Sequence, residues 1–342
     1  MYDQLYQGDS IEIMKRIQEN KVNMIYLDPP FFTNRSFESS SYDGNKINFE
    51  DIWKNGINEY LEFMRNVIQE SIRILSKTGL LFLHCDWHAN HYLKIELDKI
   101  FGYHNFVNEI IWKRHNSQNN SKQGSKIFGR LHDTIFIYSK DSTYTWNHLY
   151  QQYSKEYVDK TYNKIDKKTK ERYALGDLSG PGGSSKGNPY FEFLGFKKYW
   201  RYNKQKMTKL YEENKIVQTK PNTVPKLKRY LKDMKGIGLS DIWTDIQNEQ
   251  TKNKKNIMYP TQKPVTLLER IISCSTKKGD LVLDPFCGSG TTLIACNNLE
   301  RRWIGIDSNA ISIKTIQNRL ELENVKKNQY EFKKIMVKHI QI

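Results

Sequence analysis

Three short apolar segments, each followed directly by an aspartate, constrain the fold of this 342-residue chain more than any other feature. Residues 24–27, 281–283 and 303–306 are runs of the kind that form buried strands. Segments of helical periodicity alternate with these and other apolar runs, which is typical of an open α/β sheet with some antiparallel pairing. Ligands of such sheets bind outside the carboxyl ends of the strands, so we expect three carboxylates to line one rim. They are those of Asp28, Asp284 and Asp307.

The first of these aspartates begins the sequence Asp28-Pro29-Pro30-Phe31. Because proline has no backbone N–H, this tip offers carbonyl oxygens and donates very little. The carboxylate adds further acceptors and Phe31 adds a ring, which suits an aromatic ligand that carries an exocyclic NH2 group. A proline-stiffened turn with a capping aspartate explains the same four residues equally well.

The second aspartate precedes a glycine-rich turn, residues 285–290, and a predicted helix that begins at Thr291. The glycines let the backbone approach a ligand, and the helix offers its N-terminal N–H groups. Thr291 stands where a Walker loop has lysine, and acids after the strands disfavour a triphosphate. Asp307, 23 residues after Asp284, is placed as the acid that binds a ribose diol. S-adenosylmethionine, with a diol, an amine and a positive charge, fits these groups, while a dinucleotide fits the glycine pattern alone.

The middle of the chain differs in composition from its two ends. Residues 151–235 contain 21 Lys and Arg against 9 Asp and Glu, so they contribute +12 of the net charge of +16. The same residues include 13 aromatics and the turn-forming run 179–188, with no clean periodicity. Basic side chains contact phosphates and rings contact bases or grooves, so this composition favours nucleic-acid binding over a merely solvated basic face.

Residues 28–31, together with the sequence DPFCGSGTT at 284–292, resemble the S-adenosylmethionine-dependent DNA amino-methyltransferases. The order of tip, basic region, the PTQKP sequence at 260–264 and glycine loop resembles the circularly permuted beta group of that family. The resemblance covers the first 140 residues and those after about 240. It implies an α/β fold, namely a Rossmann-like class I methyltransferase sheet with a flanking or inserted basic target-recognition region.

The resemblance also implies three regions and their partners. Residues 1–140 and 251–342 would form the two parts of the catalytic domain, and residues 141–250 the target-recognition region. The reaction would be site-specific transfer of a methyl group from S-adenosylmethionine to N6 of a flipped-out adenine in double-stranded DNA. A homodimer and a cognate restriction endonuclease are further candidate partners.

Site residues follow from the same resemblance. Aspartate at the first tip position most often accompanies adenine in this family, whereas serine most often accompanies cytosine N4. The fourth position is usually Tyr, and Phe31 keeps the ring while losing only the hydroxyl. Asp307 would hold the ribose, Asp9 would border the adenine of the cofactor, and Thr261 and Lys263 would reach its methionine end. The residues implied to hold the target base are Asp28, Pro29, Pro30 and Phe31, and those implied to bind the cofactor are Asp9, Thr261, Lys263, Asp284, Phe286, Gly288, Gly290, Thr291 and Asp307.

Other functions remain open on the sequence. Within the class, cytosine-N4 methylation is the main alternative and RNA is a weaker alternative substrate. A non-catalytic nucleic-acid-binding protein that retains the fold is disfavoured by the intact Asp28 and glycine loop. A small-molecule methyltransferase would leave the basic middle region unexplained.

Metal, thiol and membrane chemistry are not indicated. The cluster of histidine, cysteine and aspartate at residues 84–91 matches no zinc spacing, so we expect no metal and interpret Asp86 as a pocket or capping residue. Its metal-type residues are His84, Cys85, Asp86, His88 and His91. The four cysteines form no CxxC pair, and Cys287 is interpreted as a small packing residue. We find no signal peptide and no apolar run of about 20 residues, so we expect a cytoplasmic protein without a membrane partner.

Overall fold

The computed structural model describes residues 3–40, 46–114, 126–247, 262–323, 325 and 329–335. The chain divides into two compact units: unit 1 is Met1–His148 with Ser240–Ile342, and unit 2 is Leu149–Leu239. The sequence had suggested boundaries at 140 and 250, whereas residues 141–148 and 240–247 belong to unit 1. Asn147 illustrates this, because its side-chain amide donates hydrogen bonds to the carbonyls of Ser273 and Thr276.

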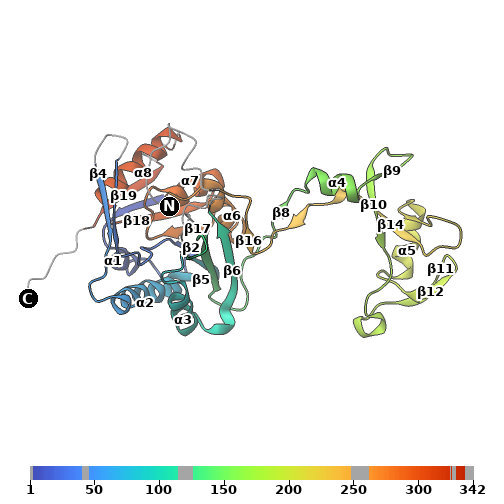
Figure 1. The fold of residues 1–342 in the computed structure, drawn as a ribbon, viewed down its shortest axis with the longest axis horizontal. Coiled ribbons are helices and arrows are strands. Elements are labelled where there is room, and N and C mark those ends of the chain that lie inside the picture. Colours follow the sequence, from blue (N-terminus) through green and yellow to red (C-terminus); the bar gives the residue numbers. More distant parts are fainter. Residues whose placement is uncertain are drawn as a thin grey trace, which may run out of the picture. The chain divides into compact units, whose positions relative to one another are not determined.

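A nine-stranded sheet forms the centre of unit 1 (Figure 1). Strand β7 is antiparallel to both its neighbours, and every other adjacent pair is parallel. The strand order reverses between the central strands β2 and β17. From β2 the chain continues to β5 on one side of the sheet, and from β17 it continues to β18 on the other side. In spatial order the strands are β16 (Ile242–Trp243), β6 (Phe106–Lys113), β7 (His132–Ser139), β5 (Leu75–Cys85), β2 (Val22–Leu27), β17 (Leu281–Asp284), β18 (Arg302–Asp307), β1 (Asp3–Gln7) and β19 (Tyr330–Lys334).

Helices flank this sheet on both faces (Figure 1). One face carries α1 (Ser10–Met14), α2 (Ile57–Ile74) and α3 (Asn90–Phe101). The other carries α6 (Val265–Ser275), α7 (Thr291–Asn298) and α8 (Ala310–Leu322). The central strands are covered on both faces and are accordingly apolar along their length, as β2 shows with Met24 to Leu27 all buried. The expected α/β sheet with some antiparallel pairing is confirmed.

Two strand regions differ from the sequence-based expectation. Residues 33–50, interpreted as a polar loop, include an antiparallel hairpin of β3 (Arg35–Ser40) and β4 (Lys46–Asp51). The basic tail includes β19, which pairs with β1 at the edge of the large sheet. Each segment is largely polar and alternates apolar and polar residues over only four positions, 47–50 and 330–333, so pairing with the partner strand contributes strongly to its conformation. No helix in the described part of the chain is long and apolar enough to cross a membrane.

Unit 2 is built from short strands around its own small core. Its elements are α4 (Lys155–Thr161), α5 (Lys204–Glu212), a four-stranded antiparallel sheet of β13 (Ile216–Val217), β14 (Lys226–Tyr230), β10 (Arg172–Asp177) and β9 (Lys164–Ile165), a hairpin of β11 (Tyr190–Phe193) and β12 (Phe196–Tyr199), and a pair of β8 (Tyr150–Gln151) and β15 (Ile237–Gly238). Single 3-10 turns lie at Tyr103–Asn105 in unit 1, and at Gly183–Lys186 and Leu231–Asp233 in unit 2. Trp200, Phe193 and Met207 are buried in the core of unit 2. Part of the aromatic content of the middle region therefore serves packing.

Candidate active site

A cavity of about 640 Å³ opens where the strand order reverses. This is the position at which open α/β sheets bind their ligands. Gly290 does not line the cavity, and Thr261 lies outside the described residues. The sequence-predicted residues that line it are Asp9, Asp28, Pro29, Pro30, Phe31, Lys263, Asp284, Phe286, Gly288, Thr291 and Asp307.

Gly290 affects the conformation of the glycine loop without lining the cavity. Its φ of +79° is a conformation that only glycine adopts readily, and an added Cβ would lie 3.0 Å from Cγ1 of Ile316. Helix α7 begins at the next residue. We infer that Gly290 serves the loop by allowing this close turn and not by touching a ligand.

Asp284, at the end of β17, fastens the glycine loop. One carboxylate oxygen accepts a hydrogen bond from the backbone N–H of Phe286 (3.0 Å), and the other accepts from the hydroxyl of Thr292 (2.5 Å). Burial, together with the nearby charges of Asp28 and Asp307, raises the pKa of Asp284 to about 7 against these two hydrogen bonds. The ionised form of this carboxyl group is therefore disfavoured in the cavity as it stands.

Asp307, at the end of β18, accepts two backbone hydrogen bonds. The N–H of Gly288 lies 2.9 Å from Oδ2, and the N–H of Asn309 lies 2.8 Å from Oδ1. Burial raises the pKa of Asp307 to about 6, and hydrogen bonds from Asn309, Gly288 and Ser312 oppose the rise. A carboxylate has about four lone-pair positions, and three donors contact this one, so about one position remains for a ligand.

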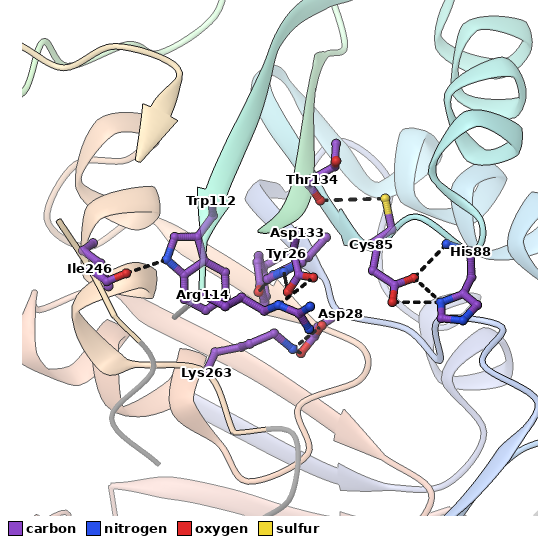
Figure 2. Close-up of polar contacts among 12 residues, drawn as sticks. Tyr26, Asp28, Cys85, His88, Trp112, Arg114, Asp133, Thr134, Ile246 and Lys263 are labelled. Atoms are coloured by element: carbon purple, nitrogen blue, oxygen red, sulfur yellow. Dashed lines mark hydrogen bonds and ion pairs between the residues drawn. The ribbon is translucent and has the colours of Figure 1, made fainter. Parts of the chain in front are cut away.

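Asp28 is paired with Lys263 across the cavity (Figure 2). The Lys263 ammonium lies 2.7 Å from Oδ1 and 2.5 Å from Oδ2 of this carboxylate, and 5.2 Å from the centre of the Phe31 ring. The resemblance had placed Lys263 at the methionine end of a cofactor, whereas the structure brings it to the aspartate of the tip. A donor group already occupies the acceptor site that the sequence predicted.

Tyr26 and Asp133 belong to a buried hydrogen-bonded chain next to Phe31 (Figure 2). The hydroxyl of Tyr26 lies 2.7 Å from Nδ1 of His84, and Nε2 of His84 lies 3.1 Å from Oδ2 of Asp133. An ionised carboxylate can only accept, so Nε2 of His84 donates to Asp133, and Nδ1 shares the second hydrogen bond with the hydroxyl of Tyr26. The His84 and Phe31 ring centres are 5.7 Å apart, so this chain fixes the surface on which Phe31 rests.

Charges around Asp133 stabilise its ionised form. Burial alone would raise the pKa of Asp133, but the hydrogen bond and charge of His84, and the charges of Arg114 and Lys263, lower it below its usual value. Nε of Arg114 lies 3.3 Å from Oδ1 of Asp133. The chain next to Phe31 is thus anchored by an ionised carboxylate.

The wall of the cavity contains residues that sequence reasoning missed. Asp51 accepts hydrogen bonds from the backbone N–H and hydroxyl of Thr33 (2.6 and 2.7 Å) and from the indole of Trp53 (2.8 Å). The Phe63 ring centre lies 5.5 Å from that of Trp53 and 6.0 Å from that of Phe286. Asp51 is the last residue of the unexpected hairpin and Trp53 follows it, and the one sequence signal for them was the aromatic residue just beyond a polar segment.

The histidine and cysteine residues at 84–91 are divided between different tasks. His84 belongs to the buried chain, and both oxygens of Asp86 hold Nδ1 of His88 at 2.8 and 2.9 Å. Asp86 also accepts from the N–H of His88, but helix α3 has Ala89 at its N-cap and no side-chain cap, and Asp86 does not line the cavity, so neither role expected for Asp86 is found. Among the described residues, no group of three or more His, Cys, Asp or Glu side chains is arranged to hold a metal ion. Cys287 is buried, and burial raises its pKa well above the usual value, as befits a packing residue.

Comparison with known proteins agrees with this geometry. The sequence profile of a DNA methylase family matches residues 22–318. The chain is 33% identical over 321 residues to the type II methyltransferase M.EcaI of Enterobacter cloacae, covering 92% of this chain and 68% of that protein. It is 26% identical over 319 residues to the DNA adenine methyltransferase YhdJ of Escherichia coli K12, covering 92% and 81%. The crystal structure of TTHA0409 from Thermus thermophilus, in complex with S-adenosyl-L-methionine, matches with a TM-score of 0.53 at 18% identity over 98% and 99% of the two chains.

The fold and its rim of carboxylates define a Rossmann-like α/β protein of the methyltransferase type, which confirms the predicted fold class. Within that class, the chain belongs to the family of DNA methylases.

Proposed function

We propose that this protein transfers a methyl group from S-adenosylmethionine to N6 of an adenine extruded from double-stranded DNA. The observation that carries the proposal is the convergence of Asp28, Asp284 and Asp307 on one cavity at the reversal of strand order. The first carboxylate sits on a proline-rich acceptor tip, and the other two flank a glycine loop. One cavity thus offers a site for an amino group beside a site for a cationic nucleoside.

The residues present fit the cofactor. Asp307 has a lone pair left for a ribose hydroxyl, while Asp284 holds the loop in place. Burial raises the pKa values of both acids, and a cationic ligand beside them would favour their ionised forms. When bound, S-adenosylmethionine supplies an electrophilic methyl group on a sulfonium. The roles of Asp9 at its adenine and of Thr261 and Lys263 at its methionine end are part of this proposal.

Asp28 and the carbonyl of Pro29 then act on the target base. Adenine N6 is a poor nucleophile because its lone pair is delocalised into the ring. Hydrogen bonds from its two N–H groups to these acceptors draw the nitrogen towards tetrahedral geometry and localise that lone pair. Lys263 must release or share Asp28 when the amino group arrives, because its ammonium contacts both carboxylate oxygens.

Stacking positions the base for reaction. A base paired within a duplex cannot reach this tip, so it must leave the helix and stack on Phe31, whose ring rests on His84. Alignment of the nitrogen with the methyl group then lowers the barrier chiefly through proximity and orientation. No group in this scheme needs to form a covalent bond to the base.

Unit 2 is proposed to supply target recognition. It contains all of residues 151–235, with their charge of +12. Such a surface contacts the phosphates of a duplex. The permuted motif order of the beta group, a homodimer and a cognate restriction endonuclease are further parts of the proposal, supported by the order of the motifs and by the similarity to the type II methyltransferase M.EcaI.

The choice of adenine over cytosine as the target base depends on a single residue. Asp28 at the first tip position is the ground for N6 of adenine, with N4 of cytosine as the alternative. The test is to incubate the protein with radiolabelled S-adenosylmethionine and unmodified DNA of varied sequence, and to identify the labelled nucleoside by mass spectrometry. Label on N6-methyladenine is expected. Label on N4-methylcytosine would reverse the base assignment, and DNA binding without any label would favour a non-catalytic DNA-binding protein.

A further inference from the structure

A compact stack of side chains stands apart from the proposed reaction. The guanidinium of Arg130 lies 3.7 Å from the centre of the Trp87 ring, and the imidazole of His88 lies 3.8 Å from it. Two groups that close to one ring centre cannot share a face, so they cover opposite faces of the indole. His88 is held in turn by both oxygens of the buried Asp86.

This stack lies at the same edge of the sheet as the acceptor tip. Strand β5, which ends at Cys85, is the parallel neighbour of β2, and Leu83 is paired with Leu27 one residue before Asp28. Strand β7 is antiparallel and begins at His132, so the segment before it returns to this same edge. Trp87 and Arg130 therefore lie at the same edge of the sheet as the proposed base site.

The stack is exposed and positively charged. Trp87 remains 47% exposed even though both faces of its ring are covered, so the indole presents an edge to solvent. Arg130 is exposed, and among the described residues no acid forms an ion pair with it. Two residues before it, Phe128 is 97% exposed. An exposed apolar edge beside a cation is suited to a duplex, which offers base edges next to phosphates.

We propose that the stack of Arg130, Trp87 and His88 is a DNA-contacting wedge of unit 1. Trp87 packs against the base pairs from which the target base is extruded, and Arg130 contacts a neighbouring phosphate. His88 and Asp86 hold the indole rigid, so that its edge and not a flexible chain meets the duplex. The role of the wedge in extruding the base rests on the proposed function, whereas its contact with DNA does not.

Binding is measured first, because it requires no methyl transfer. The full-length protein is titrated onto a fluorescent duplex of mixed sequence, and anisotropy is followed at several salt concentrations. Trp87→Ala is expected to weaken binding about fivefold or more. Arg130→Gln is expected to lower the slope of log K against log salt by about one.

A matched control lies at the opposite edge of the sheet. Tyr103 is 69% exposed and also carries a cation over its ring, the ammonium of Lys94 at 5.6 Å. Tyr103 precedes β6, which runs parallel to the central strands. It therefore lies at the edge of the sheet where those strands begin, opposite the edge that carries the cavity. Tyr103→Ala is expected to bind DNA within about twofold of the unchanged protein. Equal affinities of Trp87→Ala and Tyr103→Ala would overturn the wedge.

Methylation then tests the role in extrusion. The first substrate is an unmodified duplex that contains the sequence the enzyme methylates. The second is the same duplex with a mismatch opposite the target adenine, because a mismatched base costs least to extrude. Trp87→Ala is expected to lose at least about fivefold in rate on the paired duplex and less than about twofold on the mismatched one. Equal losses on both would overturn the role in extrusion. If the unchanged protein binds DNA but methylates nothing, the proposed function fails, and the anisotropy comparison still decides the wedge.

Discussion

Acidic side chains occupy opposite environments in the two units. In unit 2, Asp166 accepts hydrogen bonds from the ammonium of Lys228 (2.5 Å) and the hydroxyl of Tyr230 (2.8 Å), and these lower its pKa well below the usual value. In unit 1, burial raises the pKa of Asp284 to about 7 and that of Asp307 to about 6. Asp166 is paired with the ammonium of Lys228. The ionised form of Asp284, by contrast, is opposed by the nearby charges of Asp28 and Asp307.

This difference separates structural from functional acids. Asp166 also accepts from the backbone N–H groups of Lys168 and Thr169, so it organises the turn in which it sits. The acids of unit 1 are gathered at one rim, where like charges and burial work against their ionised forms. Carboxylates in that state gain most from a cationic ligand, which is why perturbed acids in a cavity point to a binding site.

The largest expected effect comes from removing an acid of unit 1. Asp28→Ala takes away the acceptor for the target amino group, so the single-turnover methylation rate should fall about a hundredfold or more. Affinity for S-adenosylmethionine should change by less than about threefold, since Asp28 faces the base. Asp166→Asn in unit 2 is the matched control, and at saturating DNA it should leave the rate unchanged. Equal rate losses in the two variants would break the distinction between the acids.

A smaller effect is expected from the basic charge of unit 2. Replacing the exposed Lys197, Lys204 and Lys206 with Gln should weaken duplex binding about thirtyfold near physiological salt, and should lower the slope of log K against log salt by about three. The controls are three exposed lysines of unit 1 near the amino edge of the sheet: Lys77, Lys277 and Lys278. Binding lost equally in both sets would mean that total charge, and not unit 2, attracts the DNA.

Opposite pH dependences of stability should also distinguish the units. Because the pKa values of Asp284 and Asp307 are raised on folding, the stability they confer is present at acid pH and is lost as pH rises from about 4 through about 7. Because the pKa of Asp166 is lowered, its contribution is present above the usual value and is lost as pH falls below about 4.

Amide hydrogen exchange, corrected for intrinsic rates, resolves the two units. Protection in β17 and β18 of unit 1 should fall at least about tenfold between pH 5 and pH 8 in the cofactor-free protein. Protection in β10 and β14 of unit 2 should be constant over that interval. A parallel fall in both units would assign the effect to the whole chain and not to the acid rim.

The sequence predicted the parts of the site whose signals are local. A buried strand that ends in an acid and a glycine turn that precedes a helix can each be recognised within a few residues. Parallel strands bring such ends to one edge, so the amino-acid sequence alone sufficed to place Asp28, Asp284 and Asp307 together. Most of the predicted cofactor-binding residues line the same cavity for this reason.

The remaining parts depend on contacts between distant residues. Lys263 meets Asp28 across 235 positions of sequence, and no local pattern reveals that pairing. Asp51 and Trp53 reach the cavity through a polar hairpin whose strands are decided by their mutual pairing. Trp200 is one of the 13 aromatics of the basic region, and composition does not reveal that it is buried in the core of unit 2.

Calorimetric titration of S-adenosylmethionine against its demethylated product, S-adenosylhomocysteine, tests the acid rim of unit 1 most directly. The two ligands share the nucleoside and amino-acid groups, and only the first carries the sulfonium charge. A cation beside Asp284 and Asp307 lowers their pKa values, so near pH 6.5 the first ligand should release up to about one proton and the second much less. Heats measured in buffers of different ionisation enthalpy give the proton count. Equal proton release by both ligands, or no binding of either, would contradict the account.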